Sequence, residues 1–326
     1  MDAPARNDSA AHRGGDDPTA PWTTRRLLRW IDGHLAQKGV DSPRVCAEML
    51  VGHVIRAERM RLYMEADRPA SADELERLRA LVQRAARHEP VQYLVGEAWF
   101  WSKRFAVGPA TLIPRPATEH AVEECIAAAR AAAERGSIPV RVLEIGTGTG
   151  CITVCTALGL SGERRTAEPG DPKRAVDTAF VATDLVPAAL DLARANAVAH
   201  GMAARIDFRA GSLWAPLRAD ERGTFDVLVS NPPYVADDEW DEMAPNVRDH
   251  EPRTALAGGA QGMDVLAPLI AGAHEWLRPG GRLVVEIGHR QRDAVLAAAR
   301  ANPALANADV RKDFEGFWRL LVADRR

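Results

Sequence analysis

The sequence predicts an α/β protein in which helices cover both faces of a mostly parallel sheet, with a small helical domain in front of it. Two observations lead to this fold class. After about residue 140, short apolar runs alternate with helical stretches, which is typical of parallel sheets covered by helices. Before about residue 90, apolar residues recur at helical spacing instead. A length of 326 residues allows roughly two domains.

The helical domain is expected over residues 22–90. One of its helices starts at Pro43, because proline is favoured in the first helical turn. Ser71 and Glu74 have the spacing of a capping box and predict the start of a further helix. Residues 1–21 are polar and rich in Gly and Pro, which indicates a disordered tail and not a signal peptide.

The α/β domain is expected over residues 116–326, after a hairpin linker at residues 91–115. Within the linker, "YLVGEAWFWSKRFAV" mixes aromatic and β-branched residues around Gly96, as hairpins do. A helix then follows "TLIPRPATE" and runs to about Arg135. The polar stretch 161–177 has no periodicity and predicts an exposed insertion before the second strand of the sheet.

Short apolar runs supply the predicted strands of the sheet. In chain order they are "VRVLEIG", "TAFVATD", "ARIDFRAG", "FDVLVSN" and "GRLVVEIG". In a parallel sheet the carboxyl ends of the strands meet at one rim, and ligands bind there. Side chains that directly follow these runs are therefore candidates for a functional site.

The first strand ends in the glycine-rich loop "EIGTGTG", residues 144–150. Glycine lets the backbone approach a ligand closely, and the N-terminus of the following helix favours negative charge. The loop does not match the dinucleotide fingerprint or a Walker loop, because Cys and Thr stand at positions 151 and 153 and no Gly-Lys-Ser/Thr follows. A pyrophosphate cofactor is disfavoured, and a tight turn without a ligand is the alternative.

Two further candidates follow the second and third strands. Asp184 ends the second strand, where a carboxylate is able to accept both hydroxyls of a ribose. It is also placed to cap the helix that starts near Pro187, and the two roles are compatible. Leu213 and Trp214 follow the third strand and are placed to contact an adenine ring, although a Trp in an apolar run is more typical of the core.

The fourth strand is followed by Ser230-Asn231-Pro232-Pro233-Tyr234. Consecutive prolines fix φ and donate no backbone hydrogen bond, so they form a rigid elbow directly after a buried strand. An ordinary strand-ending turn is the alternative for an isolated Asn-Pro pair. Here the elbow, the glycine loop and the two candidates above are all expected at one rim of the sheet, which favours a shared cleft.

These features resemble a class I S-adenosylmethionine-dependent methyltransferase, which has a Rossmann-like sheet, and more narrowly the HemK/PrmC family. The resemblance covers roughly residues 22–325. It is carried by "EPVQYLVGEAWFW" (89–101), "ATLIPRPATE" (110–119), "EIGTGTG" (144–150), "NPPY" (231–234) and "VRDHEPRTALAGGAQGMDV" (247–265). The family methylates the side-chain nitrogen (N5) of the glutamine in the GGQ motif of peptide chain release factors. The resemblance therefore implies S-adenosyl-L-methionine as cofactor and release factors as protein substrate.

The resemblance also implies roles for individual residues. Cofactor binding falls to Gly146, Thr147, Gly148, Thr149, Gly150, Asp184, Trp214 and Asn231. Glutamine binding falls to Asn231, Pro232, Pro233, Tyr234 and Phe100, and catalysis to Asn231, Pro232 and Tyr234. Phe100 is equally placed to be a core residue of the hairpin, and Arg115 is placed to help close the site. The helical domain is expected to recognise the protein substrate.

An amide nitrogen is a poor nucleophile because its lone pair is delocalised into the carbonyl. The backbone carbonyl of Pro232 and the side-chain oxygen of Asn231 are suited to accept its two hydrogens. As positive charge grows on the nitrogen, both oxygens bind it more strongly than in the ground state. Tyr234 is expected to stack on the amide and to add a cation–π contribution of about 0.5–2 kcal/mol. No general base is required before the transfer.

The amino-acid composition helps to judge the alternative functions. A net charge of −3 and the acidic run 237–242 beside the elbow argue against a nucleic-acid amino-methyltransferase, which needs a basic surface. A glutamine methyltransferase that acts on a ribosomal protein remains an alternative, as does a non-catalytic binding module with the same fold. Neither alternative changes the predicted fold.

Metal binding and membrane attachment are not expected. The four cysteines lack metal-site spacing with histidines, and His250 beside Glu251 has no second histidine at ligand spacing. No apolar run approaches the ~20 residues that span a bilayer. The cysteine usage fits the reduced cytoplasm best. The sequence does not predict an oligomeric state.

Overall fold

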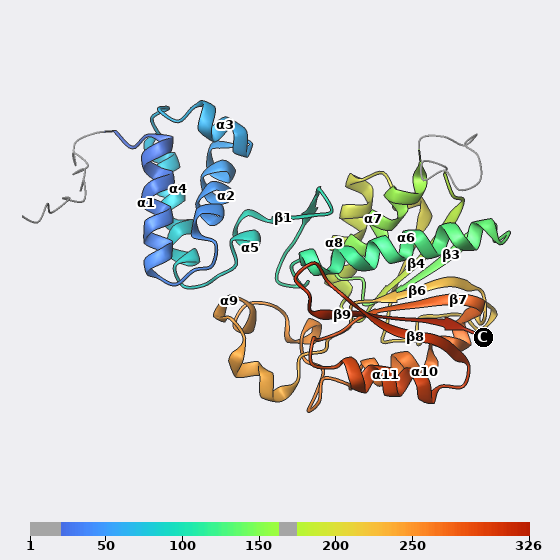
Figure 1. Cartoon of the computed structure of the whole chain (residues 1–326). Coiled ribbons are helices and arrows are strands. Elements are labelled where there is room, and N and C mark those ends of the chain that lie inside the picture. The colour runs from blue at the N-terminus through green and yellow to red at the C-terminus, as the bar shows by residue number, and fades with distance from the viewer. Residues whose placement is uncertain (1–20, 163–174) are drawn as a thin grey trace, which may run out of the picture. The chain divides into compact units, whose positions relative to one another are not determined.

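The computed structural model describes residues 21–162 and 175–326. Residues 1–20 of the predicted tail and residues 163–174 of the predicted insertion therefore lie outside the described residues. The chain divides into two compact units, residues 1–87 and residues 88–326. Each unit has its own elements, which Figure 1 labels in chain order.

The first unit is helical, as its apolar spacing predicts. Its helices are α1 (Thr24–Gln37), α2 (Pro43–Ile55), α3 (Arg59–Met64) and α4 (Ala72–Ala85). Pro43 opens α2 and Ser71 is the N-cap of α4. The predicted capping box is confirmed, because the Ser71 hydroxyl accepts from the backbone N–H of Glu74 while the Glu74 carboxylate accepts from that of Ser71. Leucine side chains such as Leu35 and Leu50 fill the core of the unit.

The second unit begins with a short helix and a hairpin. Helix α5 (Val91–Val95) precedes the antiparallel strands β1 (Glu97–Phe100) and β2 (Lys103–Ala106). The turn of the hairpin lies at Trp101 and Ser102, both at positive φ. Gly96 precedes the hairpin and ends α5, because its φ of 77° makes the left-handed C-cap for which glycine is suited.

A seven-stranded sheet forms the centre of the second unit, with the order β5-β4-β3-β6-β7-β9-β8. Its strands are β3 (Val140–Ile145), β4 (Thr178–Asp184), β5 (Ile206–Ala210), β6 (Phe225–Ser230), β7 (Leu277–Glu286), β8 (Leu305–Lys312) and β9 (Trp318–Arg325). The five predicted strands are confirmed and run parallel to one another. The antiparallel strands β8 and β9 were not predicted.

Helices cover both faces of this sheet, which confirms the predicted fold class. The α-helices are α6 (Glu119–Glu134), α7 (Cys151–Ser161), α8 (Pro187–Ala199), α9 (Pro245–Arg248), α10 (Leu266–Trp276) and α11 (Arg292–Ala301). Short 3-10 turns lie at Pro116–Thr118, Ala203–Arg205, Ala219–Glu221, Asp237–Glu242 and Arg253–Ala255. Figure 1 shows α6 and α7 on one side of the strands and α10 and α11 on the other, and each side has its own apolar core.

The topology positions a site at the middle of the sheet. Strand β3 pairs with β4 on one side and with β6 on the other, so the chain order changes direction between β3 and β6. Ligands of open α/β sheets bind outside the carboxyl ends of the strands at such a switch point. Within the two described stretches, no helix is long and apolar enough to cross a membrane.

Candidate active site

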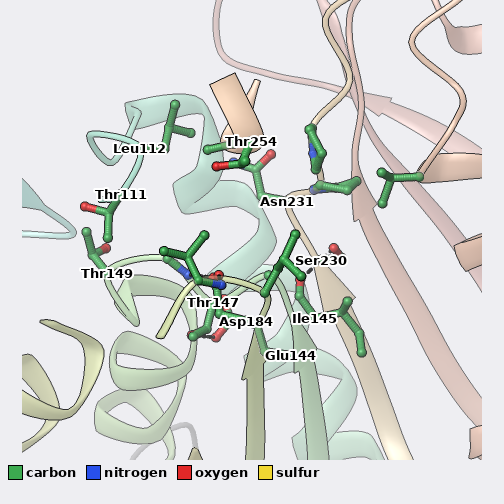
Figure 2. Close-up of a pocket in the computed structure, with 18 of the residues that line it drawn as sticks. Thr111, Leu112, Glu144, Ile145, Thr147, Thr149, Asp184, Ser230, Asn231 and Thr254 are labelled. Carbon is green, nitrogen blue, oxygen red and sulfur yellow. Dashed lines mark hydrogen bonds between the residues drawn. The ribbon is translucent and has the colours of Figure 1, made fainter. Parts of the chain in front are cut away.

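A cavity of about 450 Å³ lies at this switch point. Its floor comes from residues that follow β3, β4, β5 and β6, and the segments 110–118 and 254–265 complete its wall. Figure 2 shows Asn231 of the elbow together with Glu144, Thr147 and Asp184, which point into the same space, and Thr254 beside it. The structure therefore brings the predicted glycine loop, acid and elbow together.

The glycine loop lines the cavity through Gly146, Thr147, Gly148 and Thr149. The backbone N–H groups of Gly146 and Thr147 both donate to the carbonyl of Thr183, at 2.8 and 2.9 Å, which ties the loop to the end of β4. Gly150 is the N-cap of α7 and does not line the cavity. A Cβ atom there would lie 3.2 Å from Cβ of Ala193, so glycine is required for the close approach of the loop to α8.

Asp184 is held rigidly at the end of β4. Its Oδ2 accepts from the backbone N–H of Gly148 and its Oδ1 from that of Val186, both at 2.8 Å. Burial raises the pKa of Asp184, while these backbone donors lower it. The N-cap of α8 is Val186, so the alternative in which Asp184 caps this helix is wrong. The carboxylate instead fixes the glycine loop and faces the cavity.

Glu144 is a site residue that the sequence interpretation missed. It is 1% exposed, and its Oε2 accepts from the hydroxyl of Thr147 and from the backbone N–H and hydroxyl of Thr153. Its Oε1 has no hydrogen-bond partner among the described residues, and burial raises its pKa to about 7. The sequence signal was a lone carboxylate inside the apolar strand "VRVLEIG".

The elbow lines the cavity with Asn231, Pro232 and Pro233. The hydroxyl of Ser230, the last residue of β6, donates to the carbonyl of Ile145 at 2.7 Å and so joins the start of the elbow to β3. The side-chain Nδ2 of Asn231 donates to the hydroxyl of Thr118 at 3.3 Å. The elbow is therefore fixed from two directions.

Besides Gly150, three more predicted site residues do not line the cavity. Trp214 stacks on Trp276 with ring centroids 6.1 Å apart, and its neighbour Leu213 lines the cavity instead. Phe100 is 2% exposed and contacts Phe105 edge to face in the core, which is the alternative considered for it. The hydroxyl of Tyr234 donates to Glu286 at 3.2 Å and its ring packs against the core under α10 and α11.

A buried ion pair closes the wall of the cavity. The guanidinium of Arg115 donates to Glu251, whose side chain is fully buried and also accepts from the backbone N–H of Ile113 at 3.1 Å. The hydroxyl of Tyr93 donates to the carbonyl of Thr111 at 2.5 Å and holds the same loop from the other end. Arg115 lines the cavity. Glu251 is thus a structural anion and not a metal ligand.

In the part of the chain that the structure describes, no three His, Cys, Asp or Glu side chains are grouped to hold a metal ion. The two cavity carboxylates, Glu144 and Asp184, accept from threonine hydroxyl groups and backbone N–H groups, and Arg115 also lines the cavity. The arrangement suits a cationic organic ligand on one side and an uncharged amide on the other.

Two protein families match the chain. The PrmC N-terminal domain family matches residues 26–96, and the RMKL-like methyltransferase domain family matches residues 121–238. The second match includes the glycine loop, Asp184 and the elbow. Both matches agree with the resemblance inferred from the motifs.

Curated relatives match nearly the whole chain. The release factor glutamine methyltransferase of Geobacter sulfurreducens is 40% identical over 275 residues, which make up 84% of this chain and 87% of that protein. The corresponding protein of Nitratidesulfovibrio vulgaris is 35% identical over 308 residues, or 94% and 97% of the two chains. The chain belongs to the release factor glutamine methyltransferase family. The resemblance to HemK/PrmC is confirmed.

Solved structures show more distant likenesses. A methyltransferase from Pyrococcus furiosus covers 77% of this chain and 98% of its own, with a TM-score of 0.44 and 17% identity. TrmN from Thermus thermophilus covers 62% of this chain and 48% of its own, with a TM-score of 0.41 and 22% identity. The placement of this chain among the release factor glutamine methyltransferases rests on the curated relatives.

Proposed function

We propose that the protein transfers a methyl group from S-adenosyl-L-methionine to the side-chain amide nitrogen (N5) of the glutamine in the GGQ motif of peptide chain release factors. One observation carries the proposal: the elbow at Asn231 lines the same cavity as Asp184 and Glu144, and Oε1 of Glu144 has no hydrogen-bond partner in the described stretches. A pocket for the methyl donor and a hydrogen-bond acceptor for the amide NH₂ group of the substrate thus line one cavity. Membership of the family supports the choice of substrate.

The residues present fit S-adenosyl-L-methionine. Asp184 has a rigidly held carboxylate that can accept hydrogen bonds from ribose hydroxyls. Among the described residues, no group donates a hydrogen bond to the buried Oε1 of Glu144, and an ammonium group would do so. Leu213 and Val186 add apolar surface for the adenine ring, the role first expected of Trp214. Bound there, the donor supplies an electrophilic methyl group. Thr147 and Gly148 complete the donor side of the cavity.

The elbow residues act on the glutamine. The carbonyl of Pro232 and Oδ1 of Asn231 accept the two amide hydrogens and hold the nitrogen in place. Because both oxygens are fixed before the reaction, they stabilise the positive charge that develops on the nitrogen without reorganising. The amide is neutral at the start, so these residues position it and no side chain has to remove a proton beforehand. Positioning of this kind lowers a barrier by up to about 7–11 kcal/mol.

The helical unit is proposed to recognise the release factor. We assign this role to residues 22–90, with residues 91–115 as linker and 116–326 as the methyltransferase domain. The match of residues 26–96 to the PrmC N-terminal domain family supports the first of these boundaries. Because release factors work in translation, the protein is expected to act in the cytoplasm.

The alternatives are not favoured. Curated relatives that cover most of the chain are named for release factors and not for ribosomal proteins or nucleic acids. A binding module without activity would have no need of a fixed amide acceptor beside the donor pocket. Each alternative is nevertheless distinguishable by the substrate that accepts the label.

Transfer of a labelled methyl group to purified release factor tests the proposal. A release factor whose GGQ glutamine is replaced by alanine is the matched control, and total ribosomal protein and RNA are parallel substrates. Label on the first release factor and not on the control supports glutamine methylation. Label on ribosomal protein or RNA alone would show that the substrate is wrong while the chemistry is right.

A further inference from the structure

A buried carboxylate lies behind the elbow. Glu286, the last residue of β7, is 2% exposed. Its Oε2 accepts from the hydroxyl of Thr118 at 2.6 Å, and its Oε1 accepts from the hydroxyl of Tyr234 at 3.2 Å. The oxygen of Thr118 in turn accepts from Nδ2 of Asn231 at 3.3 Å. Residues 118, 231 and 286 come from three separate segments and form one chain of hydrogen bonds.

Thr118 lies where the 3-10 turn Pro116–Thr118 runs into α6. Its backbone angles are helical, with φ of −69° and ψ of −16°, so it lacks the extended conformation of an ordinary N-cap and its side chain makes no capping hydrogen bond. The hydroxyl instead donates to Glu286 and accepts from Asn231, and so links the carboxylate to the elbow.

The chemistry of the three groups determines which of them donates in each hydrogen bond. An ionised carboxylate only accepts hydrogen bonds, so the single hydrogen of the Thr118 hydroxyl is committed to Glu286. The Thr118 oxygen is then an acceptor toward Asn231, which must turn its NH₂ group, and not its oxygen, toward Thr118. Asn231 Oδ1 is left to face the cavity.

We propose that Glu286, acting through Thr118, sets the orientation of the Asn231 amide so that Oδ1 is presented to the glutamine NH₂ group. Glu286 and Thr118 are positioning residues, since neither needs to touch the reacting atoms. The inference deepens the proposed function and rests on it. A reversed Asn231 amide would place an NH₂ group against the substrate NH₂ group, and two donors cannot hydrogen-bond to each other.

Burial and nearby groups act on Glu286 in opposite directions. Burial is the larger influence and raises its pKa above the ordinary value, while the hydrogen bond from Thr118, the guanidinium of Arg319, the hydroxyl of Tyr234 and the guanidinium of Arg115 lower it in part. Arg319 belongs to β9 and Arg115 to the loop before α6. These donors and positive charges stabilise the ionised form of Glu286, and the two hydroxyl groups donate to its two oxygens.

Substitution of Thr118 is the most direct test of the hydrogen bonds that connect Glu286 to Asn231. Thr118→Val keeps the shape of the side chain and removes the hydroxyl, and Thr118→Ser keeps the hydroxyl. We expect Thr118→Val to lower kcat for the release factor by about 10-fold to 100-fold, somewhat less than loss of an acceptor itself. The KM for the release factor and the Kd for S-adenosylhomocysteine should change by less than about threefold. Thr118→Ser should regain most of the rate.

A matched control removes another buried threonine hydroxyl. Thr156 in α7 is 1% exposed, and its oxygen has no hydrogen-bond partner within the described part of the chain. Thr156→Val should leave kcat and KM at the wild-type values. Glu286→Gln should lower kcat as Thr118→Val does, and the double variant should be no slower than the slower single one, because both changes break one chain.

The outcomes separate the orientation effect from the proposed function. If the wild-type protein does not methylate the release factor, the proposed function fails, whatever the variants do. If it does, a Thr118→Val rate equal to wild type overturns the inference. A loss that Thr118→Ser does not restore would also overturn it, because shape and not the hydroxyl would then matter. If Thr118→Val does not bind S-adenosylhomocysteine, its rate cannot be interpreted, and Glu286→Gln is used instead. A Glu286→Gln rate equal to wild type then overturns the inference, and a lowered kcat supports it.

Discussion

Arg115 and Glu251 form an ion pair that joins two loops far apart in the sequence across the wall of the cavity. The Glu251 side chain is fully buried, whereas that of Arg115 is 32% exposed. Both loops contribute cavity residues, Thr111 and Leu112 on one side and Thr254 and Ala255 on the other. The pair therefore holds together the part of the wall that does not belong to the sheet.

Removal of the arginine is expected to open this wall. Arg115→Ala leaves the buried Glu251 with the backbone N–H of Ile113 and without its counter-ion, which is unfavourable. We expect the Kd for S-adenosylhomocysteine to rise about 10-fold, or roughly 1.4 kcal/mol, by calorimetry. Arg290→Ala breaks the exposed pairs with Glu239 and Glu242 and is the matched control. Equal affinity in Arg115→Ala and Arg290→Ala would contradict the role given to the pair.

Asp184 is expected to govern donor affinity. Asp184→Asn keeps the size of the side chain but leaves only one acceptor oxygen for the N–H groups of Gly148 and Val186. We expect at least about a 10-fold weaker Kd for S-adenosyl-L-methionine, as expected when a charged hydrogen-bond acceptor is lost. Asp191→Asn, at an exposed pair on α8, is the control. Unchanged calorimetric affinity in Asp184→Asn would show that the ribose assignment is wrong.

Asn231 is expected to act in the reaction and not in donor binding. Asn231→Ala removes one acceptor for the substrate amide, and such a loss costs about 10²–10³ in kcat. S-adenosylhomocysteine should still bind with nearly wild-type affinity, since Asp184 and Glu144 remain in place. Single-turnover transfer and calorimetry measure the two quantities separately. A variant with full activity would rule out the elbow mechanism.

Donor binding is expected to depend on pH through Glu144. Its pKa is about 7 because of burial, so the carboxylate gains its charge as pH rises through neutrality. If Oε1, which has no partner among the described residues, receives the ammonium group of the donor, affinity should increase from about pH 6 to about pH 7. At higher pH the gain stops, because an α-ammonium group itself loses its proton at a pH of about 7.7–8.0. Glu144→Gln should bind more weakly and show a flat profile. A sloping profile in Glu144→Gln would assign the titration to another group.

The raised pKa of Glu144 also affects the stability of the ligand-free protein. Stability is expected to fall as pH rises, whereas donor affinity is expected to increase. The ordinary pKa of 4.5 applies to the unfolded chain and about 7 to the folded one, so the folded state holds the proton more tightly between these values. The contribution of Glu144 to stability is fully present below pH 4.5 and is lost as pH rises to about 7. Urea unfolding of the wild type and Glu144→Gln across this range should show the difference.

Local patterns in the sequence were sufficient for most of the fold. The parallel strands are continuous apolar runs because β6, for example, is buried along its whole length. Strand β8 was missed because only Leu305 and Val310 are buried in it and the other residues are partly or fully exposed. The turn of the hairpin could not be located from the sequence, because Trp101 and Ser102 adopt a positive φ that such residues rarely have.

The candidate site was predictable in part for the same reason. Asp184 ends β4, and Gly148 and Asn231 come shortly after the ends of β3 and β6, so parallel pairing brings all three to one rim. Thr118 and Glu286 are joined by a hydrogen bond across 168 positions, and no spacing rule connects them. Trp214 could not be oriented from the sequence, because the same dipeptide sends Leu213 to the cavity and Trp214 to the core.

The register between β3 and β6 sets the distance between the glycine loop and the elbow. Ile145 lies opposite Ser230, so the donor loop and the amide elbow leave adjacent strands at the same level, about 4.8 Å apart in the direction of the backbone hydrogen bonds. The distance between the two segments is thereby set by backbone pairing inside the sheet and not by the length of a loop. If the helical unit recognises the protein substrate, as proposed, protein engineers could replace that unit without changing this distance.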